Sequence, residues 1–157
     1  MTDRRKKALR LWICLLVINL TVIWGNSLLP GQISGAISNW VKEILAKLLP
    51  SGTEQGSSGG GLIRKLAHFT EFTCLGICLS QIFRITRTVK IQWLYLPLLC
   101  GTAAATVDET IQCFVPDRGP SIYDVGLDTL GVATGILIIF LIKRKKKTIY
   151  NMEENKL

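Results

Sequence analysis

The chain has few of the side chains that hold metal clusters or disulfide frameworks. Its 157 residues include one histidine and five cysteines. The cysteine number is odd and no CxxC pair occurs, which excludes a disulfide framework and a zinc-finger type of site. No HExxH motif or Glu-x-x-His pair is present either. We therefore predict no metal and no cofactor, with one alternative left open: a divalent ion held by the single histidine and several carboxylates.

Acidic residues are also scarce, because 11 Asp and Glu stand against 19 Lys and Arg and the net charge is +8. Nevertheless 48% of the residues are apolar and the mean hydropathy is +0.35. A soluble basic protein spreads its charges over a wetted surface, whereas here the basic residues flank apolar runs. This pattern excludes an ordinary soluble domain, argues against nucleic-acid binding and indicates a single membrane domain.

Four apolar runs are long enough to cross a bilayer, which requires roughly 17–25 mainly apolar residues. They are Leu11–Leu29, Leu66–Phe83, Ile91–Val107 and Ile122–Ile142. We predict an all-α integral membrane protein with four transmembrane helices, which form a membrane domain over residues 11–142. No small-x-small cleavage site follows the first run, and this favours an uncleaved anchor over a signal peptide.

The distribution of basic residues predicts the orientation. The N-terminal segment 1–10 and the C-terminal tail 143–157 are both basic, and four spans place them on the same side. Together with the connection between the second and third spans, that side carries 14 of the 19 Lys and Arg. The positive-inside rule then predicts that both termini are cytoplasmic.

The connection between the first two spans has two unlike parts. Apolar residues recur at spacings of three and four over residues 33–49, which predicts an extracytoplasmic amphipathic helix. Residues 51–61 are rich in Gly and Ser and predict a flexible linker. This stretch lacks the preceding strand and the Gly-Lys-Ser/Thr ending of a phosphate-binding P-loop.

Ionisable and amide side chains gather at the outer ends of the last three spans. The second span begins there, the third ends there and the fourth begins there, so the topology brings their polar residues to one boundary. Such residues are costly near a bilayer unless they face protein, water or one another, which makes them candidates for a functional site. The predicted pocket consists of Lys65, His68, Glu71, Asp108, Glu109, Gln112, Arg118, Asp124 and Asp128.

The fourth span carries a stripe of carboxylates and glycines. Asp124, Asp128, Gly131 and Gly135 recur at spacings of four, three and four, so they share one helical face. Glycines on such a face allow a neighbouring helix to approach closely. We therefore expect the stripe to point into the bundle.

Two non-catalytic roles fit the pocket. It could be a polar network that locks the bundle, but polar contacts between spans contribute only about 0.6 kcal/mol each on average. Alternatively it binds a ligand. Arg118 and Lys65 would then hold an anionic group, oriented by Asp124 and Glu109.

A membrane enzyme acting on an outer-leaflet substrate is the alternative function. His68 would be the general acid or base, and Glu71 or Asp108 would tune it, which makes these three residues the catalytic candidates. Ser121 and Cys113 are available as nucleophiles, but the sequence does not place either one beside the histidine.

Three ordered motifs resemble the signatures of VanZ-like membrane proteins. They are Lys65-x-x-His68-Phe69-x-Glu71-Phe72-x-x-Leu75-Gly76, Asp108-Glu109-x-x-Gln112-x-Phe114-Val115-Pro116-x-Arg118 and Asp124-Val125-x-x-Asp128-Thr129-x-Gly131. The segment Asn26-Ser27-Leu28-x-Pro30-Gly31, with Ser34 and Ser38 after it, resembles the part that follows the family's first span. The resemblance covers roughly residues 26–140. One departure is Asp117, where glycine is expected before the arginine.

The resemblance implies a small bacterial protein of the cytoplasmic membrane. The founding member of that family is associated with resistance to the glycopeptide antibiotic teicoplanin. We therefore expect a role in the cell envelope, with lower susceptibility to teicoplanin as the phenotype. The candidate partners are a membrane lipid, a cell-wall precursor or a lipophilic glycopeptide.

Overall fold

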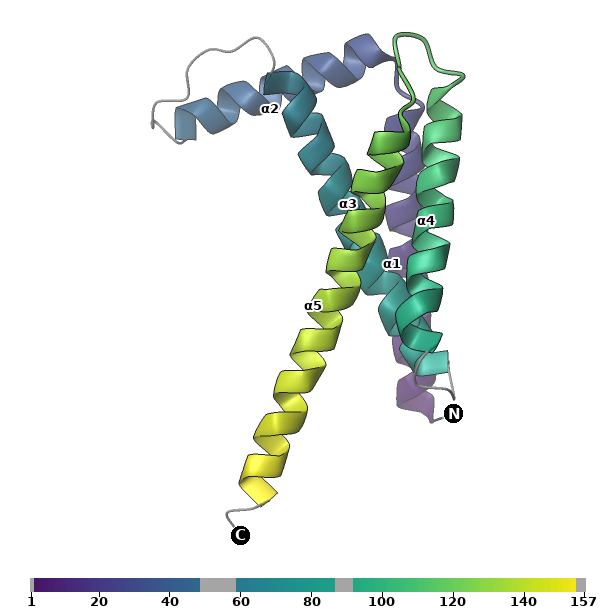
Figure 1. Cartoon of the computed structure of the whole chain (residues 1–157), viewed down its shortest axis with the longest axis vertical. Coiled ribbons are helices and arrows are strands. Elements are labelled where there is room, and N and C mark those ends of the chain that lie inside the picture. The colour runs from purple at the N-terminus through teal and green to yellow at the C-terminus, as the bar shows by residue number, and fades with distance from the viewer. Residues whose placement is uncertain (1, 49–58, 87–91, 155–157) are drawn as a thin grey trace.

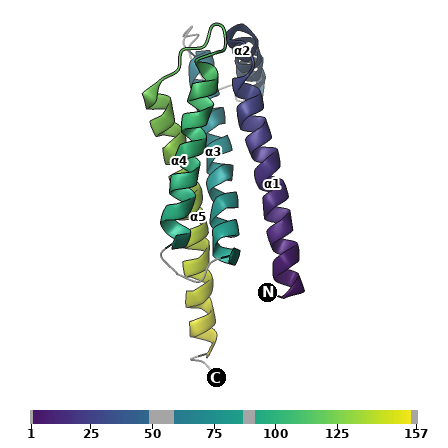
Figure 2. The same cartoon turned by 90° about the vertical axis from the view of Figure 1, so that its right-hand side faces the viewer.

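The computed structural model describes residues 2–48, 59–86 and 92–154 of the chain, and in these ranges it contains five helices and no strand. The helices are α1 (Asp3–Ser27), α2 (Gly31–Leu48), α3 (Gly59–Thr86), α4 (Gln92–Gln112) and α5 (Ile122–Glu154). The four long helices α1, α3, α4 and α5 lie side by side and run alternately in opposite directions (Figures 1 and 2). Both termini therefore lie at one end of the bundle, while α2 lies across the other end. The prediction of an all-α protein is confirmed.

Three helices in the described part of the chain are long and apolar enough to cross a membrane. They comprise Asp3–Ser27, Gly61–Thr86 and Ile122–Lys145. The predicted third span, which corresponds to α4, is not among them. Its first residue, Ile91, lies outside the described residues, and the polar residues Asp108 and Glu109 lower the hydropathy of the helix that is described.

Helix boundaries differ from the predicted ones in two places. Helix α3 begins at Gly59, so the last residues of the predicted linker 51–61 are helical, while residues 51–58 lie outside the described ones. Helix α5 continues to Glu154, far into the basic tail. Lys and Arg are good helix formers, so a helix that leaves an apolar environment can continue through them. The predicted amphipathic helix agrees with α2 to within two residues at its start.

Helix α3 is the central element of the bundle, because it packs against all four other helices. The buried core draws on four of the five helices. It contains Ile23 of α1, Phe72, Leu75 and Leu79 of α3, Ala105 of α4, and Val132 and Ile136 of α5. Helix α1 instead leaves much of its apolar surface exposed, and only 6% of its most apolar window is buried. Apolar residues on such an outer surface are what a lipid-facing helix requires.

Glycines allow α5 to cross α3 at short distance, as the stripe on the fourth span predicted. A Cβ atom at Gly135 would meet the Thr73 carbonyl oxygen, and one at Gly131 would lie 2.7 Å from the Phe69 carbonyl oxygen. From the other side, a Cβ atom at Gly76 would meet the Val132 carbonyl oxygen. The two backbones are therefore in direct contact at the crossing.

The turn between α4 and α5 holds the start of α2. Asp117 has a φ of 58°, a left-handed conformation that glycine adopts without strain and aspartate tolerates. This is the position at which the family resemblance leads one to expect glycine. The Gln32 side chain donates a hydrogen bond to the Asp117 carboxylate at 2.9 Å, and the Gly31 amide donates one to the Pro116 carbonyl at 3.1 Å. The departure at Asp117 thus keeps the turn and adds a contact to α2.

Candidate functional site

Two cations on the first turns of α3 reach neighbouring helices. The Lys65 ammonium lies 2.6 Å from the Asp124 carboxylate at the start of α5. The Arg64 guanidinium donates a hydrogen bond of 2.8 Å to the amide oxygen of Gln112 at the end of α4. The Lys65–Asp124 pair is solvated, with 52% and 27% of the two side chains exposed. Lys65 is therefore paired with Asp124, the carboxylate that was expected to orient it, and its role in holding an anionic ligand stays a prediction.

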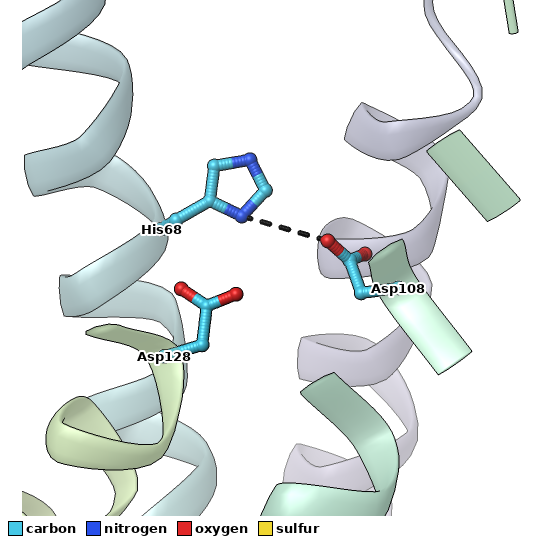
Figure 3. Close-up of side chains that lie close together, drawn as sticks. All are labelled: His68, Asp108 and Asp128. Atoms are coloured by element: carbon cyan, nitrogen blue, oxygen red, sulfur yellow. Dashed lines mark ion pairs between the residues drawn. The ribbon is translucent and has the colours of Figure 1, made fainter. Parts of the chain in front are cut away.

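His68, Asp108 and Asp128 converge from three different helices (Figure 3). The Nδ1 atom of His68 on α3 lies 3.7 Å from the Asp108 carboxylate on α4. The Asp128 carboxylate on α5 faces the same region, and Asp108 and Asp128 are 0% and 2% exposed. One Asp108 carboxylate oxygen is buried without a hydrogen-bond partner. The structure thus brings together one imidazole and two buried carboxylates.

Glu71 lies one turn beyond His68 on α3 and contacts α1. Its carboxylate accepts a hydrogen bond of 2.7 Å from the Asn26 side chain, and its backbone carbonyl accepts one of 3.2 Å from the Asn19 side chain. These bonds attach α1 to α3. Glu71 was predicted to share a pocket with the α5 carboxylates, but its closest polar contacts are with α1 instead.

At the end of α4, the Gln112 amide and the Asp108 and Glu109 carboxylates are joined by hydrogen bonds. The Gln112 amide nitrogen donates to Asp108 at 2.9 Å and to Glu109 at 3.3 Å. The second Glu109 oxygen accepts a bond of 2.8 Å from the Ser121 backbone amide. Glu109 lies beyond Val107, the last residue of the predicted third span. Burial raises the pKa of its carboxyl, and the hydrogen bond from Ser121 opposes this effect.

Arg118 holds the end of α1 to the α4–α5 turn. Its guanidinium donates to the Leu29 carbonyl at 3.0 Å and to the Asn26 carbonyl at 2.7 Å. Burial and the nearby Arg64 lower the pKa of Arg118, although an arginine remains charged at any physiological pH. The third nitrogen of the guanidinium, Nη1, is buried without a hydrogen-bond partner. Two of its nitrogens are therefore structural and one remains available.

Two adjoining cavities replace the single pocket that the sequence predicted. The α3–α5 cavity has a volume of about 120 Å³ and is lined by Gly61, Arg64, Lys65, His68, Glu109, Gln112, Gly119, Asp124, Leu127 and Asp128. The α2–α3 cavity has a volume of about 100 Å³ and is lined by Asn26, Leu29, Ser34, Ile37, Ser38, Arg64, Ala67, His68, Glu71 and Arg118. Arg64 and His68 line both cavities and form the wall between them. Asp108 lines neither cavity, but its carboxylate on α4 lies 3.7 Å from the His68 ring.

Among the charged residues that line the two cavities, Arg64 is the one that the sequence prediction missed. It precedes His68 by four residues and Glu71 by seven, so all three lie on one face of α3. That spacing could have identified Arg64, whereas the prediction selected Lys65 next to it.

The nucleophiles considered for an enzyme do not line either cavity. The Ser121 hydroxyl accepts a bond of 3.2 Å from the Tyr123 amide, which places it at the start of α5 as a capping residue. The Cys113 thiol contacts the Glu109 carbonyl oxygen at 3.4 Å. Neither residue therefore lines a cavity with His68. An acid or base role for His68 stays a prediction.

The fold and the site together define a class: helical membrane proteins whose ionisable residues converge at one end of the bundle. Within that class the sequence model of the VanZ/LLP1 family matches residues 8–143, which is most of the chain. The protein belongs to the VanZ/LLP1 family. No curated protein and no solved structure matched the sequence.

Proposed function

We propose that this VanZ-family protein binds the phosphate-bearing headgroup, of net negative charge, of an anionic membrane lipid or a lipid-linked cell-wall precursor in the α2–α3 cavity. The observation that carries the proposal is the free nitrogen of Arg118. A buried guanidinium N–H without a partner favours an anionic acceptor, and charge-assisted hydrogen bonds to phosphate are among the stronger ones. Arg64 lines the same cavity and supplies a second cation.

The charge balance favours the α2–α3 cavity over its neighbour for an anion. Two arginines and one carboxylate, Glu71, line the α2–α3 cavity, and Asn26 donates to one of the two oxygens of that carboxylate, while the other is without a partner. The α3–α5 cavity is lined by three carboxylates and two cations, and Lys65 is committed to Asp124 there. An anionic group entering the α3–α5 cavity would meet net repulsion.

The size of the cavity favours a headgroup over an antibiotic. Its volume is about 100 Å³. Pockets for drug-sized ligands are about 300–1,000 Å³. A phosphate with its first substituents fits this space, while a whole glycopeptide does not. Leu29 and Ile37 give the cavity an apolar side for the start of an acyl or prenyl chain.

The orientation in the membrane supports contact with an outer-leaflet lipid. Helix α4 lies alongside the three apolar helices, and we infer that it is the fourth span. Its polar residues Asp108 and Gln112 contact α3. Both termini then lie in the cytoplasm by the positive-inside rule, in the bacterial cytoplasmic membrane. The end of the bundle crossed by α2 carries both cavities and would face outward.

Headgroup binding offers a route to lower teicoplanin susceptibility. A lipophilic glycopeptide acts at the outer surface of the membrane, where it meets lipid-linked precursors. A protein that binds those precursors or the surrounding lipid would change how many remain accessible to the antibiotic. The effect would then arise without direct binding of teicoplanin.

The binding experiment compares two neighbouring cations: Arg64, which lines the α2–α3 cavity, and Lys65, which does not. The purified chain in detergent is titrated with phosphatidylglycerol and, separately, with phosphatidylcholine, and bound lipid is counted by native mass spectrometry. Loss of a charged hydrogen-bond partner costs about 1.5–3 kcal/mol, so Arg64→Gln should weaken phosphatidylglycerol binding by roughly tenfold or more. Lys65→Gln removes the same charge one residue away and should change it by less than about threefold.

Equal losses in the two variants, or equal binding of both lipids, would contradict the proposal. The cellular arm measures teicoplanin and vancomycin susceptibility in a sensitive Gram-positive host with matched membrane levels. Wild type and Lys65→Gln should lower teicoplanin susceptibility, and Arg64→Gln should not. If wild type equals the empty vector, the resistance part of the proposal fails while the lipid measurement stands separately.

A further inference from the structure

We infer that His68, Asp108 and Asp128 form a binding site for a divalent metal ion with nitrogen and oxygen ligands, of which Mn²⁺ is the representative. One ligand atom from each of the three residues lies within 4.8 Å of those of the other two. The residues come from α3, α4 and α5, and their polar groups face a common point (Figure 3). The inference concerns the α3–α5 cavity and does not depend on headgroup binding in the neighbouring one.

The distances between the ligand atoms suit a bound ion after small side-chain rotations. Two ligands that each lie about 2.0–2.2 Å from one metal ion are roughly 3–4.4 Å apart. The His68 Nδ1 atom and the Asp108 oxygen are 3.7 Å apart, which is within this range and too long for a hydrogen bond. The widest pair in the group needs to close by less than about 1 Å, which carboxylate rotation provides.

Burial gives an independent reason to expect a cation. Asp108 is fully buried, and one of its carboxylate oxygens has no hydrogen-bond partner. Asp128 is 2% exposed and its carboxylate lies close to that of Asp108. Two buried carboxylates repel one another and lose their hydration, so a cation bound between them would stabilise their ionised forms. A neutral imidazole is a metal ligand but brings no charge of its own.

The surroundings of the three residues resemble the support that metal ligands receive in known sites. The Gln112 amide donates to the Asp108 oxygen nearest His68, and Arg64 in turn donates to the Gln112 oxygen. Such outer contacts orient ligating carboxylates and are typical of metal sites. His68 and Asp128 line the α3–α5 cavity, so an ion bound there would have coordination positions open to water or to an anionic group.

The ion preference follows from the ligand chemistry. One imidazole with two carboxylates suits Mn²⁺ or Zn²⁺ better than a thiol-selecting metal. Mn²⁺ is the better probe for this chain, because the exposed cysteines Cys14, Cys74, Cys100 and Cys113 would bind Zn²⁺ elsewhere. The bound metal is therefore measured as Mn²⁺.

The test measures Mn²⁺ binding to the full chain in detergent, without added lipid, by electron paramagnetic resonance. Wild type should bind one Mn²⁺ per chain. Asp128→Asn should weaken this by roughly 100-fold, since loss of even an outer contact of a metal ligand costs 10–100-fold. Asp124→Asn is the matched control: it is the same substitution four residues earlier on α5, lines the same cavity, and should change affinity by less than about threefold.

A spectroscopic signature separates ligation from a structural role. Pulsed measurements on wild type should show modulation by an imidazole nitrogen bound to Mn²⁺, and His68→Gln should remove it. Asp128→Asn carries the test if His68→Gln fails to fold. The inference is overturned by absence of stoichiometric Mn²⁺ binding in wild type, by equal losses in Asp124→Asn and Asp128→Asn, or by binding without the nitrogen signal. Because the ion is measured without added lipid, this result is separate from the test of the headgroup site.

Discussion

Replacement of Gly135 by alanine tests the closest contact in the bundle. The new Cβ atom would meet the Thr73 carbonyl oxygen and would lie 2.8 Å from the Ile77 backbone nitrogen. Both neighbours belong to the backbone of α3 and cannot rotate away as a side chain does. Helix α5 must therefore move outward from α3, and a gap of about 0.5–1 Å forfeits a quarter to a half of each dispersion contact that it opens.

The size of the effect follows from two opposing terms. Alanine is a better helix former than glycine by about 1 kcal/mol, which alone would stabilise α5. Overpacking of a tight core typically costs about 1–3 kcal/mol, and contact with backbone belongs at the upper end. We expect Gly135→Ala to be destabilised by about 2 kcal/mol. At Gly126 on the same helix a Cβ atom would meet nothing within 4 Å, so Gly126→Ala should be neutral or more stable by up to about 1 kcal/mol.

Thermal unfolding in detergent, followed by circular dichroism, compares the two alanine variants with wild type. A difference of about 2–3 kcal/mol corresponds to roughly 4–12 °C in Tm for a chain of this length. Equal Tm values for Gly135→Ala and Gly126→Ala would refute the close approach of α3 and α5.

The Gly135→Ala variant also tests the metal site. Asp128 lies seven residues before Gly135 on the same face, so outward movement of α5 should weaken Mn²⁺ binding although no ligand is changed.

Two further variants address the turn between α4 and α5. Arg118→Lys should lower the free energy of unfolding by about 2 kcal/mol, because a lysine cannot reproduce the two hydrogen bonds that the guanidinium donates to carbonyls near the end of α1; an unchanged Tm would show that these bonds contribute little. Asp117→Gly should be more stable than Asp117→Ala by about 1 kcal/mol, since the residue has a φ of 58° and both variants lack the carboxylate; equal Tm values would contradict a left-handed conformation at this position.

The helices themselves were predictable because the signals for them are local. Hydropathy and charge indicated the long helices, and apolar spacing indicated α2. The stripe of Gly131 and Gly135 predicted the close face of α5 correctly, since helical periodicity fixes which residues share a face. The start of α3 was placed at the wrong residue because a Gly-rich sequence predicts a linker, whereas the following helix extends back into it at Gly59.

The division of the polar residues into two cavities was not predictable from spacing. Spacing shows that Arg64, His68 and Glu71 share a face of α3, but a helical face is wide enough to contact two neighbours. Helix α1 binds Glu71 through Asn26, while α4 and α5 surround His68. Which neighbour a residue meets depends on crossing angles and tertiary packing, and these are not encoded in the period of one helix.

The two cavities have opposite charge character, and only one helical face separates them. Arg64 and His68 line both, so a charge bound on one side acts on the other over a short distance through partly buried protein, where electrostatic interactions are stronger than in water. A divalent ion beside His68 would offset the carboxylates of α4 and α5 and lower the cost of an anionic headgroup next to Arg64. Any such coupling is reciprocal, so a bound phosphate would also favour the ion. Joint binding of a cation and an anion would account for the many ionisable side chains at one end of the bundle, because polar contacts between spans contribute little to bundle stability.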